Sequence, residues 1–311
     1  MTGEVTADGA FGLLSNEIRV GILRAVASAQ NEKIRAGIDE GRTGTLVAEM
    51  PFSDIYERVE VDNTSKFSYH LGELTGTFLR KGENGYSFTH AGEQIIRFIV
   101  AENYLQPLDF GPLETNGCCL YCGESALEAM LHDQFFMIQC SDCERPVTGY
   151  MITPAQTRCR TGTDLLESLK YKQATDCMLV QQGVCPACAG RVDTEVAIVE
   201  ETGISALDGS FVTIDECQQC LRIYSGLLTY AVAYHPSSVA FHWDHGIDLM
   251  QTGLWEFHHH VREGRWTSER TETDSTEYRV ILRQGSAALR VSLDETGEVV
   301  RTERVRRRTI D

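Results

Sequence analysis

Eight of the eleven cysteines form four Cys-x-x-Cys pairs in the middle of the chain. Two consecutive pairs of this kind make a four-thiolate site, the usual way for a short, loop-rich segment to bind zinc. The first two pairs are 17 residues apart, within the usual range, and the last two are 28 residues apart. The sequence therefore predicts two zinc ribbons with one zinc ion each, held by Cys119, Cys122, Cys140 and Cys143 and by Cys185, Cys188, Cys217 and Cys220.

Four cysteines leave no open coordination position, so we expect structural rather than catalytic zinc. A redox role of the pairs would need a βαβ setting, which these segments lack. Loss of zinc as a signal of oxidants or of zinc supply stays open. Cys118 could replace Cys119 by a shift of register, while Cys159 and Cys177 are interpreted as small buried apolar residues.

The residues between the cysteine pairs predict the strands and the helix that position these cysteines. Ribbon 1 spans residues 115–150 and includes a strand at Phe135–Ile138, which leads into the second pair. A connecting helix lies within residues 160–183. Ribbon 2 spans residues 184–235, where strands at 192–200 and 209–216 would take up the longer spacing.

Residues 236–311 are expected to form a small α+β segment. Helical patterns cover residues 235–246 and 254–261, and residues 277–305 alternate as a three-stranded antiparallel meander. Six histidines between 235 and 260 are interpreted as core or surface residues, since no acidic residues complete a metal pattern. The arginine-rich end, 301–308, is either a solvated strand face or an additional contact to DNA backbone.

Residues 11–105 follow the order of a winged helix-turn-helix. The first helix, capped by Ser15, precedes a loop at 31–44, and helices over 53–59 and from Asn63 or Thr64 come next. Asn84-Gly85 predicts a hairpin, and a last helix spans about 90–105. That last helix is apolar on more than one face, which favours burial against more than its own domain.

Three stretches carry a family resemblance: LSNEIR at 14–19, FSYHL at 67–71 and GYSFTHAG at 85–92. They resemble the ArsR-type winged-helix regulators, in the version found in halophilic archaea. The resemblance covers about a third of the chain and implies that the third helix enters the DNA major groove, that the wing follows the backbone and that a homodimer forms through terminal helices. The segment FSDIYERV at 52–59 lacks the cysteine motif of the metal-sensing members, so sensing of arsenite there is not supported.

The DNA contacts implied by this resemblance fall on eight residues. Ser68 and Tyr69 are candidates for base edges. The start of the helix and the wing suit phosphate, because exposed N–H groups and cations favour an anion; these residues are Asn63, Thr64, Ser65, Lys66, Arg80 and Lys81. His70 is interpreted as a packing residue rather than a ligand.

The composition indicates a soluble cytoplasmic protein of two or three domains. The net charge is −17, and five lysines stand against 23 arginines. An acidic, lysine-poor chain is typical of a salt-loaded cytoplasm, although an acidic mesophilic protein remains the alternative. The first residues lack the pattern of a signal peptide, and no stretch approaches the roughly 20 apolar residues of a membrane helix.

These features predict an α+β multidomain transcription regulator that binds double-stranded DNA as a homodimer. The zinc-stabilised middle and the C-terminal region would form a platform for a protein partner or a small effector. The competing hypothesis is an adaptor in the transcription machinery, and the redox or zinc-supply sensor is a further one. An enzyme is disfavoured, because the sequence has no nucleophile–base set, no phosphate-binding glycine loop and no open metal site.

Overall fold

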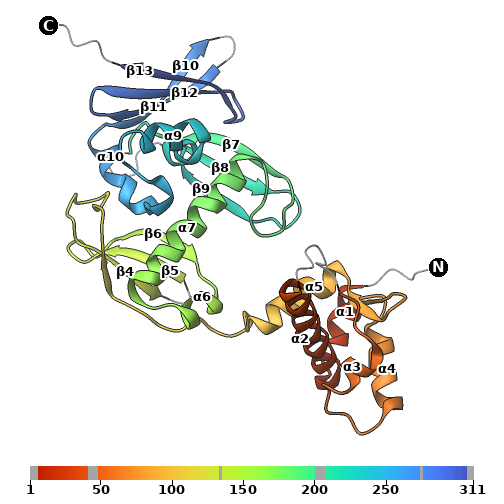
Figure 1. Ribbon diagram of the computed structural model, residues 1–311. Helices are drawn as coiled ribbons and strands as arrows, with labels where there is room; N and C mark the ends of the chain where they lie inside the picture. The colour runs from red at the N-terminus through yellow and green to blue at the C-terminus, as the bar shows by residue number, and fades with distance from the viewer. Residues whose placement is uncertain (1–5, 41–47, 133–134, 200–206, 274–275, 307–311) are drawn as a thin grey trace, which may run out of the picture. The chain divides into compact units, whose positions relative to one another are not determined.

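The computed structural model describes residues 6–40, 48–132, 135–199, 207–273 and 276–306. The chain forms two compact units, Met1–Gln106 and Pro107–Asp311 (Figure 1). Both combine helices with small antiparallel sheets. None of the helices in the described ranges is long and apolar enough to cross a membrane.

Unit 1, Met1–Gln106, has helices on either side of a two-stranded hairpin. A short helix precedes the first expected one, and the other elements follow in the predicted order. They are α1 (Ala7–Leu13), α2 (Glu17–Asp39), α3 (Phe52–Tyr56), α4 (Thr64–Leu74), β1 (Leu79–Lys81), β2 (Tyr86–Phe88) and α5 (His90–Val100).

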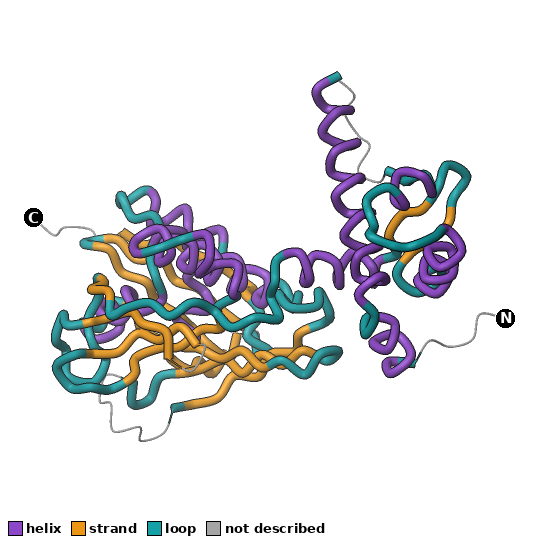
Figure 2. Tube along the Cα trace, turned by 90° about the horizontal axis from the view of Figure 1, so that it is seen from below, coloured by secondary structure: helices purple, strands orange, loops and turns teal. Residues whose placement is uncertain are grey.

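The helix α2 corrects two expectations. Its N-cap is Asn16, whose side chain accepts two backbone N–H groups, and not Ser15. The predicted loop at 31–44 is wrong as far as Asp39, because the Glu, Lys, Arg and Ala residues of this stretch favour a helix despite Gly37. Ile34 packs against the core of unit 1. Figure 2 shows the last turns of α2 standing clear of the shorter helices, and residues 41–44 lie outside the described ranges.

The core of unit 1 lies between α2 and α4. Phe67, Leu71 and Leu74 of α4 are buried with Ile22 and Val26 of α2. The spacing of four and three residues places the apolar residues of α4 on one face, which leaves the opposite face to solvent.

The last helix of unit 1 differs from the prediction. It ends at Val100, and its buried residues are Gly92 and Ile96. Phe98 and Val100 are 43% and 51% exposed, so the expected burial on more than one face is not present in this single chain. Association through this surface stays a prediction.

Unit 2, Pro107–Asp311, begins with two sheets joined by helices. The first sheet has the order β3-β4-β5-β6 and the second has the order β7-β8-β9, with every pair of neighbours antiparallel. The strands are β3 (Leu113–Thr115), β4 (Leu127–His132), β5 (Phe135–Cys140), β6 (Pro146–Met151), β7 (Val192–Ile198), β8 (Phe211–Cys217) and β9 (Ile223–Leu227), and the helices between the sheets are α6 (Pro154–Cys159) and α7 (Gly162–Gln181).

The rest of unit 2 is a group of short helices and a third sheet. The helices are α8 (Leu228–Ala231), η1 (Val232–Tyr234), α9 (Pro236–Trp243), η2 (Leu249–Gln251), η3 (Leu254–Phe257) and α10 (His258–Arg262). The sheet has four strands in sequence order, β10 (Trp266–Thr273), β11 (Thr276–Gln284), β12 (Ala287–Leu293) and β13 (Val299–Arg306). The sequence pattern predicts three strands in this meander and not the fourth, β10. The sequence of β10, WTSERTET, has one large apolar residue, Trp266, and so lacks the alternation of apolar and polar residues.

The three sheets and the helices of unit 2 share two hydrophobic cores. One contains Phe211 and Leu227 of the second sheet, Ala174 of α7 and the inner face of the third sheet. The other contains the inner residues of the first sheet, three leucines of α7 and Trp255 of η3. Residues far apart in the sequence therefore share each core, and the helices η3 and α10 reach back to the first sheet.

Candidate metal centres and candidate nucleic-acid face

The four Cys-x-x-Cys pairs adopt one turn, repeated four times. In each pair the N–H of the first cysteine donates to the carbonyl five residues later, at 2.8–3.0 Å, as in Cys119 to Glu124 and Cys185 to Gly190. The N–H of the residue after the second cysteine donates back to the carbonyl of the first, again at 2.8–3.0 Å. Both hydrogen bonds fold the pair so that its two thiols lie on one side.

The residue after each second cysteine lies in the left-handed region of φ. These residues are Gly123 (89°), Glu144 (58°), Ala189 (59°) and Leu221 (60°). This conformation costs a residue with a Cβ about 1 kcal/mol or more. In three of the four turns, other contacts of the cysteine group must therefore offset this cost. The sequence signals such a turn only at Gly123.

The thiols of the four turns gather in two groups, Cys119/Cys122/Cys140/Cys143 and Cys185/Cys188/Cys217/Cys220, and within each group all sulfurs lie within 4.8 Å of one another. The Sγ–Sγ distance is 3.6 Å for Cys119–Cys143 and 3.5 Å for Cys188–Cys217. A tetrahedron with metal–sulfur bonds of about 2.3 Å has edges of about 3.8 Å. Each group is thus compatible with one structural metal ion, and the groups combine the pairs in the order that the sequence predicted.

The two cysteine groups have the same arrangement of strands around them. Cys140 is the last residue of β5 and Cys217 is the last residue of β8. In each case a strand before and a strand after pair with that central strand. The sequence predicted the central strands and β7, but it did not predict β4 as a separate strand, and it missed β6 and β9. Most residues of β6 and β9 are exposed or half exposed.

Site 1, at Cys119 and Cys140, is covered by the C-terminal part of unit 2. Arg262 of α10 donates to the carbonyl oxygen of Leu120 at 2.8 Å, and its guanidinium lies so close to Gly123 that a Cβ there would clash. The Trp255 indole donates to Thr115 Oγ1 at 3.1 Å. These contacts join residues about 140 positions apart, and no sequence spacing could predict them.

Site 2, at Cys185 and Cys217, is more open. Its local core has four buried residues, two of which are these cysteines. Its other two cysteines, Cys188 and Cys220, are both exposed, whereas at site 1 Cys122 is exposed and Cys143 is half-buried. Burial raises the pKa of the Cys185 thiol, but hydrogen bonds from the Tyr224 hydroxyl and from backbone N–H groups outweigh this effect and lower the pKa to about 6. The pocket thus favours a thiolate at Cys185, the form that binds a metal.

The remaining cysteines lie outside both groups. Cys118 is not among the clustered thiols, and burial raises its pKa. Cys177 packs against the larger core of unit 2, as expected for a small apolar residue. Cys159 is exposed, which contradicts its predicted burial, because it is the last residue of the short helix α6.

The histidines between 235 and 260 form no third metal group within the described residues. The Nδ1 atoms of His242 and His245 pair with the carbonyl oxygens of Ser238 and Phe241, at 2.8 and 2.7 Å. His260 stacks on Trp266 with the ring planes 11° apart. His242, His258 and His260 are buried.

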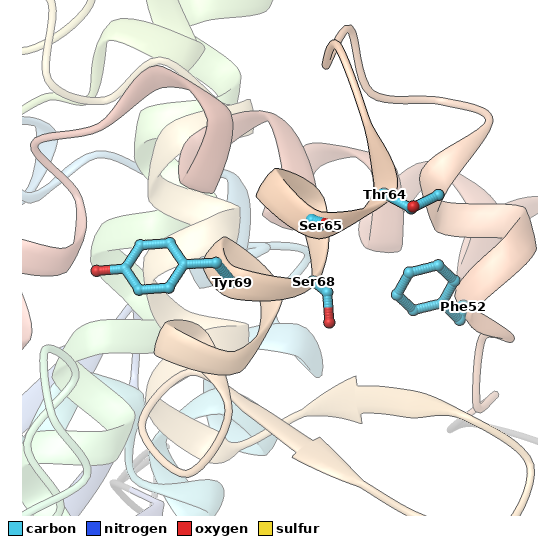
Figure 3. Close-up of a pocket in the computed structure, with 5 residues that line it drawn as sticks. All are labelled: Phe52, Thr64, Ser65, Ser68 and Tyr69. Atoms are coloured by element: carbon cyan, nitrogen blue, oxygen red, sulfur yellow. The ribbon is translucent and has the colours of Figure 1, made fainter.

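The eight residues predicted to contact DNA all have exposed positions on α4 and the β1–β2 hairpin. Asn63 is the N-cap of α4, and its side chain accepts the N–H of Lys66 at 2.9 Å. Thr64, Ser65, Ser68 and Tyr69 line an open hollow together with Phe52 (Figure 3). Tyr69 is 60% exposed and points outward.

The charge on this face is mixed. Lys66 forms an ion pair with Asp62 at 3.1 Å. Arg80 donates to Ser87 Oγ at 2.9 Å, and Lys81 lies 5.9 Å from the centre of the Tyr86 ring. His70 is buried, as predicted for a packing residue, and burial lowers its pKa.

Comparison with protein families divides the chain at about the same place as the structure. Residues 116–299, more than half of the chain and including both cysteine groups, match the family described as Domain of unknown function (DUF7351). The chain belongs to this family. Residues 7–99 match a second family, described as Domain of unknown function (DUF7347). No curated protein and no solved structure matches the chain.

Proposed function

We propose that this DUF7351 chain is a sequence-specific DNA-binding transcription regulator. In this proposal residues 11–105 are a winged helix-turn-helix whose recognition helix is α4. The observation that carries it is the two-sided character of α4, where Phe67, Leu71 and Leu74 are buried and Ser65, Ser68 and Tyr69 are exposed. Hydroxyl groups and an exposed aromatic ring beside helix-start N–H groups suit base edges and phosphates.

Unit 2 is proposed to bind two structural zinc ions, one in each cysteine group. Zinc fits because all four donors in each group are thiols and the sulfur distances match a tetrahedral ion of its size. The metal would supply much of the folding energy of the small sheets. Unit 2 then serves as the platform for a protein partner or an effector.

The test of DNA reading uses two positions on α4. Lys66→Ala together with Tyr69→Ala should abolish preference for the operator, with the thermal unfolding and zinc content of the protein unchanged. Glu57→Ala, on the exposed surface outside α4, serves as the control that keeps operator affinity. Unchanged affinity of the double variant would exclude α4 as the reading element.

The acidic charge gives a second test of the same proposal. In concentrated salt, repulsion between the −17 chain and DNA is screened, and the gain from counterion release is small. Affinity then depends on hydrogen bonds, shape and apolar contacts, so operator binding should persist in KCl concentrations that remove an ordinary regulator from DNA. Complete loss in high KCl would refute this mode of binding.

A second candidate is an adaptor that contacts proteins through the same face. The Lys66–Asp62 ion pair supports it, since a carboxylate, which repels phosphate, lies beside this cation on the surface proposed for DNA. Substitution of Asp62 by Asn separates the two functions. Removal of this carboxylate should strengthen DNA binding, whereas weaker capture of a basic protein partner with unchanged DNA binding would favour the adaptor.

A further inference from the structure

The third sheet of unit 2 has two chemically different faces. Its inner face is apolar and buried, as shown by Tyr278, Val280 and Leu282 on β11 and by Leu289 and Val291 on β12. The short helices of unit 2, among them α9, lie on that side (Figure 1). Because successive side chains of a strand alternate between faces, the residues between these positions point to the opposite side.

The outer face of this sheet carries arginines on three neighbouring strands. Its charged side chains in the middle strands and their partners are Arg279, Arg283, Arg290, Arg301, Glu269 and Glu303. With Glu277 of β11, four cations stand against three anions, and all seven side chains are exposed or half exposed. Glu277, at the end of β11, points the same way and is paired with Arg270.

The register places these arginines in an ordered array. Arg279 and Arg301 lie opposite Ser292, one on each side of β12. Two strand spacings put their backbones about 10 Å apart. Arg290 lies two residues along β12 from Ser292, and Arg283 lies four residues along β11 from Arg279, so the cations spread over a surface rather than meet at one point.

The segment that carries these arginines differs in charge from the rest of the chain. Residues 265–308 contain ten of the 23 arginines, no lysine and eight acidic residues, whereas residues 1–264 contain 18 basic and 36 acidic residues. The guanidinium group forms a planar fork that matches phosphate oxygens. A face with a small excess of positive charge, in which every cation is an arginine, is suited to a polyanion with regularly spaced phosphates.

Two ion pairs on this face do not oppose such binding. Arg279 pairs with Glu269 at 2.9 Å and Arg290 pairs with Glu303 at 3.7 Å. Exposed pairs of this kind contribute roughly 0–1 kcal/mol, so a phosphate can replace a glutamate at little cost.

We propose that the outer face of β10–β13 binds the phosphate backbone of duplex DNA, as a contact separate from α4 and without sequence preference. This inference rests on the proposed function for the choice of DNA as the polyanion. It assigns unit 2 a direct part in DNA affinity, in addition to its role as a platform.

The test compares two variants of opposite charge on the same face of the full-length, zinc-loaded protein. The first replaces Arg279, Arg283, Arg290 and Arg301 by Gln, and the second replaces Glu269 and Glu303 by Gln. Fluorescence anisotropy over a KCl series measures binding to a duplex of mixed sequence and to the operator. Circular dichroism and zinc content verify that both variants fold.

The arginine variant should bind both duplexes more weakly by the same factor. Its salt slope, the change of log affinity with log salt concentration, should fall by about 0.9 for each phosphate that an arginine no longer neutralises. The glutamate variant should bind both more tightly. Unchanged affinity and slope of the arginine variant would overturn the proposal, and so would weakening by both variants, which indicates a merely structural role of the ion pairs.

The outcome separates this inference from the proposed function. Dependence on the sheet without any operator preference supports the backbone contact and refutes sequence reading by α4. Operator binding that depends on Lys66 and Tyr69 and ignores the four arginines refutes the backbone contact alone.

Discussion

The two cysteine groups of unit 2 are built alike but are surrounded differently. Site 1 belongs to a cluster of eleven buried residues that includes Phe136 and Trp255, whereas the cluster at site 2 has four buried residues, two of them its own cysteines. The turns depend on local sequence, since each is closed by backbone hydrogen bonds within six residues. The amount of structure that a bound metal stabilises depends on long-range packing around the site, and this packing differs between the two sites.

Loss of a ligand should therefore damage site 1 more than site 2. With Cys140→Ser, we expect unit 2 to lose its cooperative unfolding, with a penalty on the order of the 10 kcal/mol that a structural zinc supplies. Cys217→Ser, the equivalent residue of site 2, should lose one zinc and keep the near-ultraviolet circular dichroism of Trp255 and Trp266. Equal damage from both substitutions would erase the distinction between the sites.

Release of metal should follow the same order. Zinc should leave in two phases under a chelator or hydrogen peroxide, with the faster phase from site 2, because two of its cysteines, Cys188 and Cys220, are exposed, whereas site 1 has one exposed cysteine, Cys122. A colorimetric zinc assay gives the phases, and mass spectrometry of trapped thiols assigns them. A single phase, or early modification of Cys119 and Cys140, would contradict this order.

Acid should destabilise the packing of α10, the helix that places Arg262 over site 1. Burial, together with the nearby His259 and Arg265, lowers the pKa of His260 in α10 to about 3. An unfolded histidine has a pKa near 6.5, so the unfolded state binds more protons below that value and stability falls as the pH drops from about 6.5 toward 3. His260→Phe keeps a ring against Trp266 and should flatten the pH dependence of the free energy of unfolding, by on the order of 2 kcal/mol at pH 5. The same slope in both proteins would rule out His260 as the titrating group.

The smallest expected effect concerns one side chain that distinguishes the sites. Arg262→Ala removes the hydrogen bond to Leu120 and the cover over Gly123. Zinc release from site 1 should become about tenfold faster, as is common when a residue that supports a metal site is removed. Arg191→Ala, at an exposed arginine beside site 2, is the matched control and should leave site 1 unchanged.

The difference between the sites also marks what the sequence could predict. Cysteine spacing sufficed to pair the eight thiols, because a Cys-x-x-Cys turn is a local structure. It did not predict the left-handed residues Glu144, Ala189 and Leu221, whose side chains carry no preference for that conformation. The contacts of Trp255 and Arg262 with ribbon 1 were also beyond prediction, since they join segments that sequence patterns treat separately.

In unit 1 the apolar spacing of α4 and the Asn84-Gly85 turn predicted both elements. Asn63 was predicted as a possible cap and is one. Prediction failed at 31–39, where polar residues indicated a loop although Glu, Lys, Arg and Ala favour a helix. Gln30 and Lys33 also donate to the backbone carbonyl oxygens of residues 48 and 49, which fixes this turn of α2.

We propose that unit 2 holds the metal and that α4 reads the DNA. The most direct test of this division is selection from a pool of random duplexes with the zinc-loaded, full-length protein, followed by sequencing of the bound fraction. We expect one enriched motif with two-fold related half-sites, and we expect it to vanish with Lys66→Ala and Tyr69→Ala. Recovery of duplexes without any enriched motif, or of the same motif with the double variant, would contradict the central claim.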